Sequence, residues 1–238
     1  MNGKPVMGAG DRQPAMCRHE TCDRQTAAPG KQLAIIDYKA GNLTSVKLAF
    51  DSLGLESVIT ADPAVIRAAS HVVFPGVGAA GSAMANLQAL NLLPVLREII
   101  SAGRPFLGIC VGTQILFDFS EEDGGTPCLG ILAGRVALFH PSDSRDKVPH
   151  MGWNQVCIRR RHRLLDGIAD NCDFYFVHSY FPQPANPDDV IGTTDYAGVN
   201  FAAMVGRGNV AAVQFHAEKS GPVGLKLLEN FAKWDGRA

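Results

Sequence analysis

Short apolar runs alternate with amphipathic segments through the first half of the chain. The apolar runs have the length of buried strands, and they predict strands at residues 33–37, 57–60, 71–74 and 105–110. The segments between them repeat apolar side chains at helical spacing, which predicts helices at residues 43–53, 63–69, 82–90 and 94–102. Strands that alternate with helices predict an α/β fold, with a doubly wound, mostly parallel sheet flanked by helices.

The pattern changes after Phe119, where β-like segments follow one another with clusters of Gly, Pro, Asn and Asp between them. Strands are predicted at residues 135–139, 155–159, 174–178, 190–193, 201–205 and 210–215. We expect these strands to form an antiparallel extension of the sheet or a small second layer. A final amphipathic segment, Val223 to Trp234, predicts a helix that covers one face.

Residues 1–31 lack any hydrophobic periodicity, and we expect them to be a disordered, dispensable extension before one domain at residues 32–238. They contain no apolar core of the kind that secretory signals have. Cys17, His19 and Cys22 lie close together in the sequence. Structural zinc sites need four ligands, however, and there is no second pair of Cys or His residues to complete such a set. Chance proximity is therefore the favoured interpretation, and no metal site is predicted.

Charge and cysteine usage narrow the class of protein. The 22 basic and 23 acidic residues leave a net charge of −1, which favours neither nucleic acid nor an anionic membrane as a partner. The longest apolar runs are too short to span a bilayer. Six scattered cysteines without a C-x-x-C pair fit free thiols in a reducing cytoplasm. The basic cluster at residues 159–163 is interpreted as a solvated strand end and turn, with contact to a phosphate or a partner as the alternative. No cofactor fingerprint is present.

Candidate chemistry begins with Cys110, which ends an apolar strand and is framed by Gly108 and Gly112. This is the thiol version of the nucleophile elbow, a sharp turn from a strand into a helix, which the amphipathic segment at residues 113–119 would supply. A β-carbon at either glycine would collide with neighbouring backbone in so tight a turn. The helix start would favour a thiolate. By itself the motif leaves a nucleophile and a buried structural cysteine about equally supported.

A second motif, formed by His216 and Glu218, favours the interpretation of Cys110 as a nucleophile. His216 and Glu218 follow the apolar strand at residues 210–215, and side chains two apart in an extended segment point the same way. The pair can supply a base for the thiol and a carboxylate that orients the base. Together with Cys110, the pair predicts a cysteine hydrolase.

Five stretches together resemble a known family. The sequences Gly-Ile-Cys-Val-Gly-Thr-Gln and Gln-Phe-His-Ala-Glu-Lys-Ser are similar to those of class I, or triad, glutamine amidotransferases. Pro-Gly-Val-Gly at 75–78, Val-Pro-His-Met-Gly-Trp-Asn at 148–154 and Phe-Tyr-Phe-Val-His-Ser-Tyr at 174–180 resemble the glutaminase subunits of imidazole glycerol phosphate synthase. The likeness runs from about Leu33 to the C-terminus. It departs at Ala217, where the family usually has Pro, and at Val111 and Thr113, where it commonly has Leu and Met.

The resemblance implies a role for each matching residue. Cys110 would attack the side-chain amide of glutamine, His216 would shuttle protons and Glu218 would orient His216. The backbone N–H groups of Val77 and Val111 would stabilise the oxyanion, although a plain tight turn remains an alternative at residues 75–78. The expected substrate-binding residues are Gly76, Gly78, Gln114, Glu122, Ser179 and Tyr180. Glu122 also belongs to an acidic run, and such runs are usually solvated.

The resemblance further implies a partner: the (β/α)8-barrel cyclase subunit of the synthase, which would use the ammonia in histidine biosynthesis. Trp153, Asn154, Tyr175 and Lys219 would face this subunit, and His178 would be structural. We expect allosteric activation by the partner through the backbone at Gly76. A glutaminase subunit of another pathway, such as pyridoxal phosphate synthase, and a non-catalytic assembly subunit remain alternatives.

Overall fold

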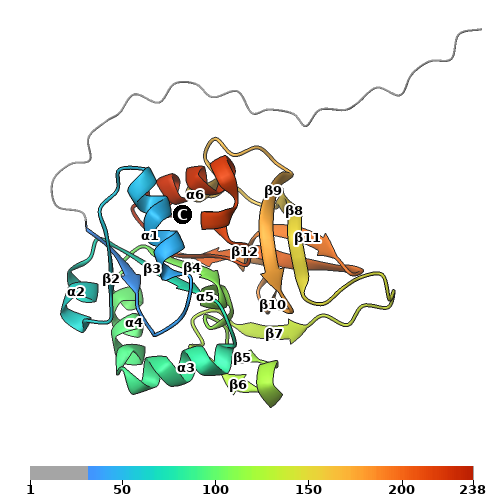
Figure 1. Cartoon of the computed structure of the whole chain (residues 1–238), viewed down its shortest axis with the longest axis horizontal. Coiled ribbons are helices and arrows are strands. Elements are labelled where there is room, and N and C mark those ends of the chain that lie inside the picture. Colours follow the sequence, from blue (N-terminus) through green and yellow to red (C-terminus); the bar gives the residue numbers. More distant parts are fainter. Residues whose placement is uncertain (1–31, 238) are drawn as a thin grey trace, which may run out of the picture.

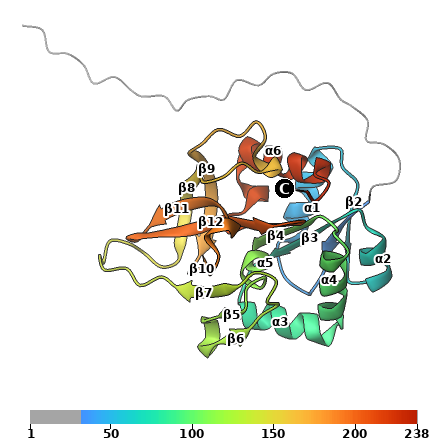
Figure 2. The same ribbon diagram turned by 180° about the vertical axis from the view of Figure 1, so that it is seen from behind.

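The computed structural model describes residues 32–237, which form a large mixed sheet, a small second sheet and flanking helices (Figures 1 and 2). The predicted extension, residues 1–31, lies outside the described residues. The large sheet has the strand order β2-β1-β3-β4-β13-β12-β11-β8-β9. Its first five strands are parallel, and they are β2 (Ser57–Thr60), β1 (Leu33–Ile36), β3 (His71–Gly76), β4 (Phe106–Cys110) and β13 (Val210–Val213).

Helices cover both faces of this parallel half, which is therefore doubly wound as predicted. Helices α1 (Leu43–Ser52) and α6 (Gly221–Lys233) pack together on one face. Helices α2 (Pro63–Ala68), α3 (Ala80–Ala89) and α4 (Leu92–Ser101) lie on the other face (Figure 1). Strands β1, β3, β4 and β13 are buried, which explains why they are nearly continuous apolar runs in the sequence, whereas the edge strand β2 is half-buried.

The second half of the chain contains both of the expected β arrangements. Four strands extend the large sheet in antiparallel fashion: β12 (Val199–Arg207), β11 (Val190–Tyr196), β8 (His150–Ile158) and β9 (Cys172–His178). A separate small sheet contains β10 (Tyr180–Pro184), β7 (Gly134–Leu138), β5 (Phe119–Ser120) and β6 (Thr126–Pro127). Strand β10 was not predicted. It follows β9 with only Ser179 between them, so this junction passes from one sheet to the other.

The predicted helix at residues 113–119 is wrong. Helix α5 (Val111–Gln114) is a single turn that begins directly after Cys110. The carbonyl groups of residues 115–117, which a longer helix would use, instead accept hydrogen bonds from the N–H groups of residues 129–132. These carbonyl groups therefore bond to a segment that is distant in the sequence instead of continuing the helix. A local sequence pattern does not reveal such competition between tertiary and helical hydrogen bonds.

Strand β8 begins five residues earlier than predicted, at His150 rather than at residue 155. Its register with β9 places Trp153 directly opposite Tyr175, and the two rings meet edge to face with centroids 6.0 Å apart. Gly152, which has a φ of 133°, interrupts the β-like composition at this point and explains why the sequence did not reveal the start of the strand.

The described chain has no helix long and apolar enough to cross a membrane. Its four cysteines, Cys110, Cys128, Cys157 and Cys172, form no disulfide with one another.

Candidate active site

Cys110 lies at the end of β4, at the turn into helix α5, and its backbone has a φ of 55° and a ψ of −107°. A non-glycine residue rarely adopts this conformation, and such strain is typical of functional turns. The flanking glycines are required by close approach, as the sequence predicted. A Cβ at Gly108 would lie 2.5 Å from the carbonyl oxygen of Gly112, and a Cβ at Gly112 would collide with the carbonyl oxygen of Phe74.

His216 and Glu218 come together after β13 ends. Nδ1 of His216 lies 2.7 Å from Oε1 of Glu218, and both side chains are almost fully buried. The predicted backbone conformation was wrong, because Glu218 lies in a short 3-10 turn (Ala217–Lys219) rather than in an extended segment. The two side chains are nevertheless in contact. The amide of Asn42 also donates to Glu218 Oε1, at 2.6 Å. Two donors therefore fix the carboxylate.

Hydrogen bonds hold the turn that carries these residues, although Ala217 stands where the family usually has Pro. The hydroxyl of Ser220 donates to the carbonyl oxygen of His216 at 2.6 Å and accepts from the N–H of Tyr175 at 3.0 Å. The N–H of His216 donates to the carbonyl oxygen of Tyr175 at 2.8 Å. These bonds tie the turn to β9 without help from a proline.

The charge state of His216 is set by its neighbours. Burial lowers the pKa of its imidazole, but Cys110 and Glu218 outweigh burial and raise this pKa to about 10. The second ring nitrogen, Nε2, is buried and has no hydrogen-bond partner with ordinary geometry among residues 32–237. His216 is thus arranged to accept a proton at Nε2 while Nδ1 donates to Glu218.

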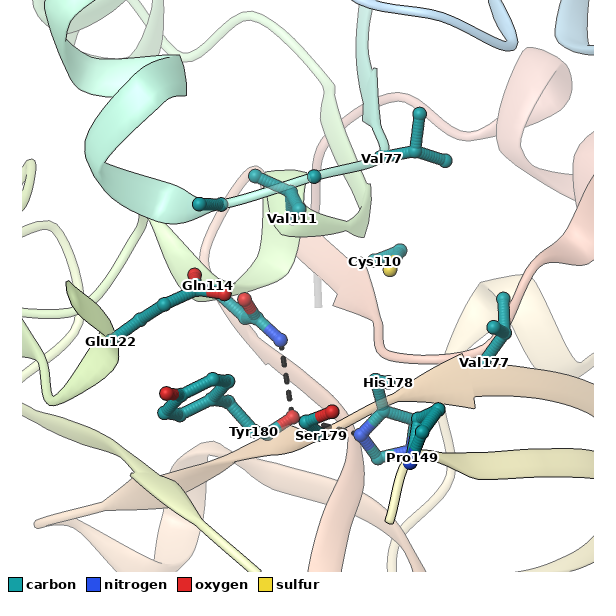
Figure 3. A pocket seen from close by; sticks show the side chains of 12 residues that line it. Val77, Cys110, Val111, Gln114, Glu122, Pro149, Val177, His178, Ser179 and Tyr180 are labelled. Atoms are coloured by element: carbon teal, nitrogen blue, oxygen red, sulfur yellow. Dashed lines mark hydrogen bonds between the residues drawn. The ribbon is translucent and has the colours of Figure 1, made fainter.

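A cavity of about 370 Å³ opens beside Cys110 (Figure 3). Its wall comes from the ends of β3 and β4, the turn around Glu122 and the β9–β10 junction, so segments far apart in the sequence meet here. In an open α/β sheet this is the usual position for a ligand, beyond the carboxyl ends of the parallel strands. The residues that line it are Val77, Gly78, Ala79, Cys110, Val111, Gln114, Glu122, Pro149, Val177, His178, Ser179 and Tyr180.

The segment predicted to carry an oxyanion donor follows β3. Gly76 pairs with Cys110 in the parallel register of β3 and β4, so Val77 emerges beside the cysteine. A Cβ at Gly76 would collide with the hydroxyl of Tyr38, which explains this glycine by close packing. Gly78 has open space around its Cα but a φ of 98°, so its backbone conformation is the reason for glycine there.

Gln114 and Glu122 both line the cavity, and their side chains lie next to each other (Figure 3). The amide nitrogen of Gln114 donates to the carbonyl oxygen of Tyr180 at 3.1 Å. A carboxylate oxygen of Glu122 accepts from the N–H of Ala80 at 2.7 Å, at the start of α3. Burial raises the pKa of Glu122, and the bond from Ala80 partly opposes this effect. The side chain of Glu122 is therefore half-buried and engaged, unlike one in a solvated acidic run.

The four residues expected at a partner interface differ in exposure. Trp153 is 58% exposed, Lys219 is exposed and Tyr175 is half-buried. Asn154 is engaged within the chain, where its amide donates to the carbonyl oxygen of Asp195 at 3.0 Å and reaches Nε2 of His150 at 3.3 Å.

No metal site emerges in residues 32–237, and two arginines of the basic run contact groups within the chain. No group of three or more His, Cys, Asp or Glu side chains in that range is arranged to hold a metal ion. The cluster formed by Cys17, His19 and Cys22 lies outside the described residues. In the basic run at residues 159–163, Arg160 donates to the carbonyl oxygen of Gly206 at 2.7 Å, and Arg163 lies 3.6 Å from Asp166.

Comparison with known proteins agrees with this geometry. The sequence model of the family described as glutamine amidotransferase class-I matches residues 34–234. The chain is 52% identical over 207 residues to the imidazole glycerol phosphate synthase subunit HisH of Nitratidesulfovibrio vulgaris (strain DP4), covering 85% of this chain and 96% of that protein. It is 50% identical over 210 residues to the HisH subunit of Aromatoleum aromaticum, covering 85% and 98%. The chain belongs to the HisH family of class-I glutamine amidotransferases.

Solved structures show the same fold at lower identity. A glutamine amidotransferase crystal structure superposes with a TM-score of 0.64 at 16% identity, covering 84% of this chain and 97% of that one. A chain of PurLQS from Thermotoga maritima gives a TM-score of 0.67 at 16% identity, covering 86% and 98%. The fold class predicted from the strand and helix pattern is therefore confirmed, and as a glutamine amidotransferase this HisH-family chain is an enzyme that hydrolyses glutamine.

Sequence reasoning missed three side chains at this amidotransferase site. Asn42 was not among the predicted site residues, yet its side-chain amide donates to Glu218. Tyr38 is buried, and its hydroxyl, which lies above Gly76, has no hydrogen-bond partner within residues 32–237. Gln214 is fully buried and donates to Cys110. A signal existed only for Gln214, because it lies two residues before His216 along the same strand end.

Proposed function

We propose that Cys110, His216 and Glu218 carry out the hydrolysis of glutamine to glutamate and ammonia, and that the ammonia passes to a cyclase subunit. The observation that supports this most is the strained Cys110 turn beside a cavity of about 370 Å³, with a buried imidazole that hydrogen-bonds to a carboxylate 2.7 Å away. Nucleophile, base and orienting group are the three parts that covalent acyl transfer needs.

The first half of the reaction forms a thioester. His216 Nε2 takes the proton of Cys110, and the sulfur attacks the side-chain carbonyl carbon of glutamine. The carbonyl π electrons move to oxygen, which becomes an oxyanion beside the backbone N–H groups of Val77 and Val111. The tetrahedral intermediate collapses, its C–N bond breaks, and His216 gives the proton to the leaving nitrogen, which departs as ammonia.

The second half returns the enzyme to its starting state. Water gives a proton to His216 and attacks the thioester carbon, and collapse of this intermediate breaks the C–S bond. The sulfur leaves with the proton from His216, and glutamate is released. Glu218 keeps Nδ1 of His216 protonated throughout, so Nε2 is the atom that exchanges protons.

The amino-acid end of glutamine would bind at the cavity wall opposite Cys110. Both amide hydrogens of Gln114 are used, on the carbonyl oxygen of Tyr180 and on the side-chain oxygen of Gln214, which leaves Gln114 Oε1 as an acceptor. Glu122 supplies negative charge on the same side of the cavity. An acceptor and a carboxylate together suit the α-ammonium group, while backbone at Gly78, Ser179 and Tyr180 contributes to the rest of the site.

A partner is supported by the name of the relatives and by the surface beside the cavity. HisH proteins are named as subunits of imidazole glycerol phosphate synthase. Exposed apolar side chains are typical of protein interfaces. Val77 lines the cavity and Val148 adjoins the lining residue Pro149, while Met151 and Trp153 are exposed farther along β8. The proposed partner is a (β/α)8-barrel cyclase subunit that forms a heterodimer with this chain and uses the ammonia to make imidazole glycerol phosphate and an aminoimidazole carboxamide ribonucleotide in histidine biosynthesis. The proposed compartment is the cytoplasm.

The test separates the two chemistries. In the assembled complex, Cys110→Ala should abolish product formation from glutamine, because no thioester can form, while ammonium salts should still support product formation. Cys157→Ala, a half-buried cysteine in β8 outside the cavity lining, is the matched control and should keep both activities. Glutamine hydrolysis by the Cys110→Ala complex, or loss of its ammonium-dependent reaction while it stays assembled, would contradict the proposal.

A further inference from the structure

The sulfur of Cys110 receives a hydrogen bond that the mechanism above does not use. The side-chain nitrogen of Gln214 donates to Sγ at 3.7 Å, and Gln214 is fully buried. Sulfur is large, so donor distances to it exceed those to oxygen. His216 also interacts with the thiol, but its Nε2 makes no hydrogen bond of ordinary geometry, whereas the bond from Gln214 to Sγ does have such geometry.

A chain of hydrogen bonds fixes which end of the Gln214 amide faces the sulfur. The carbonyl oxygen of Tyr180 can only accept, so the Gln114 group that lies 3.1 Å from it must be the NH2 group. The same NH2 group lies 3.2 Å from the side-chain oxygen of Gln214. Because the Gln214 oxygen is occupied there, its own NH2 group must point to Sγ.

Because the helix after Cys110 is short, the N–H donor of Gln214 is more important for stabilising negative charge on the sulfur. Helix α5 is four residues long, so few aligned peptide dipoles are available to stabilise negative charge on the sulfur. A fixed N–H donor from a buried side chain does not depend on helix length. A hydrogen bond to the charged form of a titratable group favours that form.

We propose that Gln214 is a positioning residue for the nucleophile, which holds Sγ of Cys110 and stabilises its anionic form through an N–H···S hydrogen bond. The inference rests on the proposed role of Cys110. Gln214 transfers no proton. Its donor acts when His216 has taken the thiol proton, and again when the sulfur leaves the carbon in the second half of the reaction. Gln114, through Tyr180, keeps the amide turned the right way.

A purely structural role for Gln214 is the competing explanation, since any buried amide needs hydrogen-bond partners. The two explanations differ in what they predict for the sulfur. A structural amide affects only stability, whereas a donor on the sulfur also sets the pH at which Cys110 becomes reactive.

The experiment measures the rate of alkylation of Cys110 by iodoacetamide against pH in the isolated full-length chain. Peptide-resolved mass spectrometry separates Cys110 from the other five cysteines. In Gln214→Met, which has a similar shape but no donor, the midpoint of the profile should move to higher pH by roughly one unit, which makes alkylation about tenfold slower below the midpoint. In the assembled complex, kcat for glutamine should fall while KM changes little, because Gln214 contacts the sulfur and Gln114 remains held by the carbonyl oxygen of Tyr180.

Thr113→Val is the matched control, because it also removes a buried hydrogen bond beside the site without touching Sγ. The hydroxyl of Thr113 donates to the carbonyl oxygen of Val213 at 2.6 Å. This variant should lose stability but keep the wild-type alkylation profile. If Gln214→Met does not fold, Gln114→Met frees the Gln214 amide to rotate and should shift the profile in the same direction.

A folded Gln214→Met chain whose alkylation profile matches the wild type would overturn the inference, and so would an equal shift in Thr113→Val. Neither outcome bears on the proposed function, which fails only if the Cys110→Ala complex still hydrolyses glutamine or loses its ammonium-dependent reaction.

Discussion

Two buried histidine environments lie close together in this protein and have opposite electrostatic character. His216 contacts a carboxylate and faces a thiol, and its pKa is raised to about 10 although burial opposes this. His150 and His178 form a pair, with Nδ1 of one 3.1 Å from Nε2 of the other. Burial lowers the pKa of His150 to about 4 and that of His178 to about 3.

The neighbours explain the difference. His150 is stacked between Tyr196 and Phe176, with ring centroids 3.8 and 4.8 Å away, and no anion among residues 32–237 contributes to its pKa. The second nitrogen of His178 bonds to the carbonyl oxygen of Tyr180 at 2.8 Å. Neutral partners and aromatic walls keep these two rings uncharged, whereas Glu218 and Cys110 favour a charged ring at His216. Burial alone therefore does not decide whether a histidine is a base or part of the core.

Replacing His216 should have the largest effect. His216→Gln removes the proton acceptor while keeping a polar side chain, and glutaminase turnover in the assembled complex should fall by roughly 10²–10⁴. His150→Phe should lose stability rather than turnover. The measurements are glutamate release and the melting temperature of each variant. Full activity in His216→Gln would make His216 a structural histidine like His150.

The second largest effect is expected on the pH dependence of stability, because the buried His150–His178 pair resists protonation. Unfolded imidazoles take up protons below a pKa of about 6.5, while the folded pair resists protonation until about pH 4. The pair therefore stabilises the fold above pH 6.5, and this stability is lost as the pH falls from 6.5 towards 4, by roughly 3 kcal/mol for His150.

Denaturant unfolding at a series of pH values measures this loss directly. His150→Phe should give a shallower decline between pH 6.5 and 4, because one titrating group has been removed. The exposed His140 provides the control, and His140→Asn should leave the wild-type slope unchanged. A wild-type free energy of unfolding that is flat across this range would contradict the lowered pKa values.

A smaller effect is expected at Asn42, which supports the carboxylate that raises the pKa of His216. Asn42 has a φ of 70°, so Asn42→Gly keeps the backbone conformation and removes only the side-chain bond to Glu218. Turnover should fall about tenfold, the value of one hydrogen bond to a charged group. The pH profile of kcat should shift as the carboxylate loosens, and an unchanged rate and profile would show that His216 alone is sufficient to hold Glu218.

The smallest effect is expected for removal of residues 1–30. Their composition gives them little with which to pack, so both histidine environments should survive. Glutaminase activity of the complex and the melting temperature of the trimmed chain are the measurements. A large drop in either would assign the extension a structural or functional role.

Much of the fold was predictable because its signals are local. The parallel strands are continuous apolar runs, and the helices between them have apolar faces, so the doubly wound half follows from the sequence. The errors occurred where distant segments compete for backbone groups. Helix α5 is cut short by bonds from residues 129–132, and strand β10 is created by pairing with β7, and neither event has a local pattern.

The sequence predicted those residues of the site that belong to short motifs with a known chemical role. Cys110 and the His216–Glu218 pair could be named from spacing, and the structure brings His216 and Glu218 into contact. Asn42 and Tyr38 could not, because each reaches the site through a contact between segments distant in sequence, and the position of Gln214 two residues before His216 did not reveal its bond to Cys110. Gln114 shows the same limit, since its bond to Gln214 joins residues 100 positions apart.

The packing of Tyr38 above Gly76 has an evolutionary consequence. Any side chain at position 76 would occupy the space of the Tyr38 hydroxyl, so these two positions are expected to vary together among related proteins. Gly76→Ala should fold poorly alone and recover in part in combination with Tyr38→Phe, which deletes the hydroxyl that collides but leaves the tight contacts with the Tyr38 ring and with Val111. A tyrosine that is far from Cys110 in the sequence thereby restricts which residues selection can place beside this nucleophile.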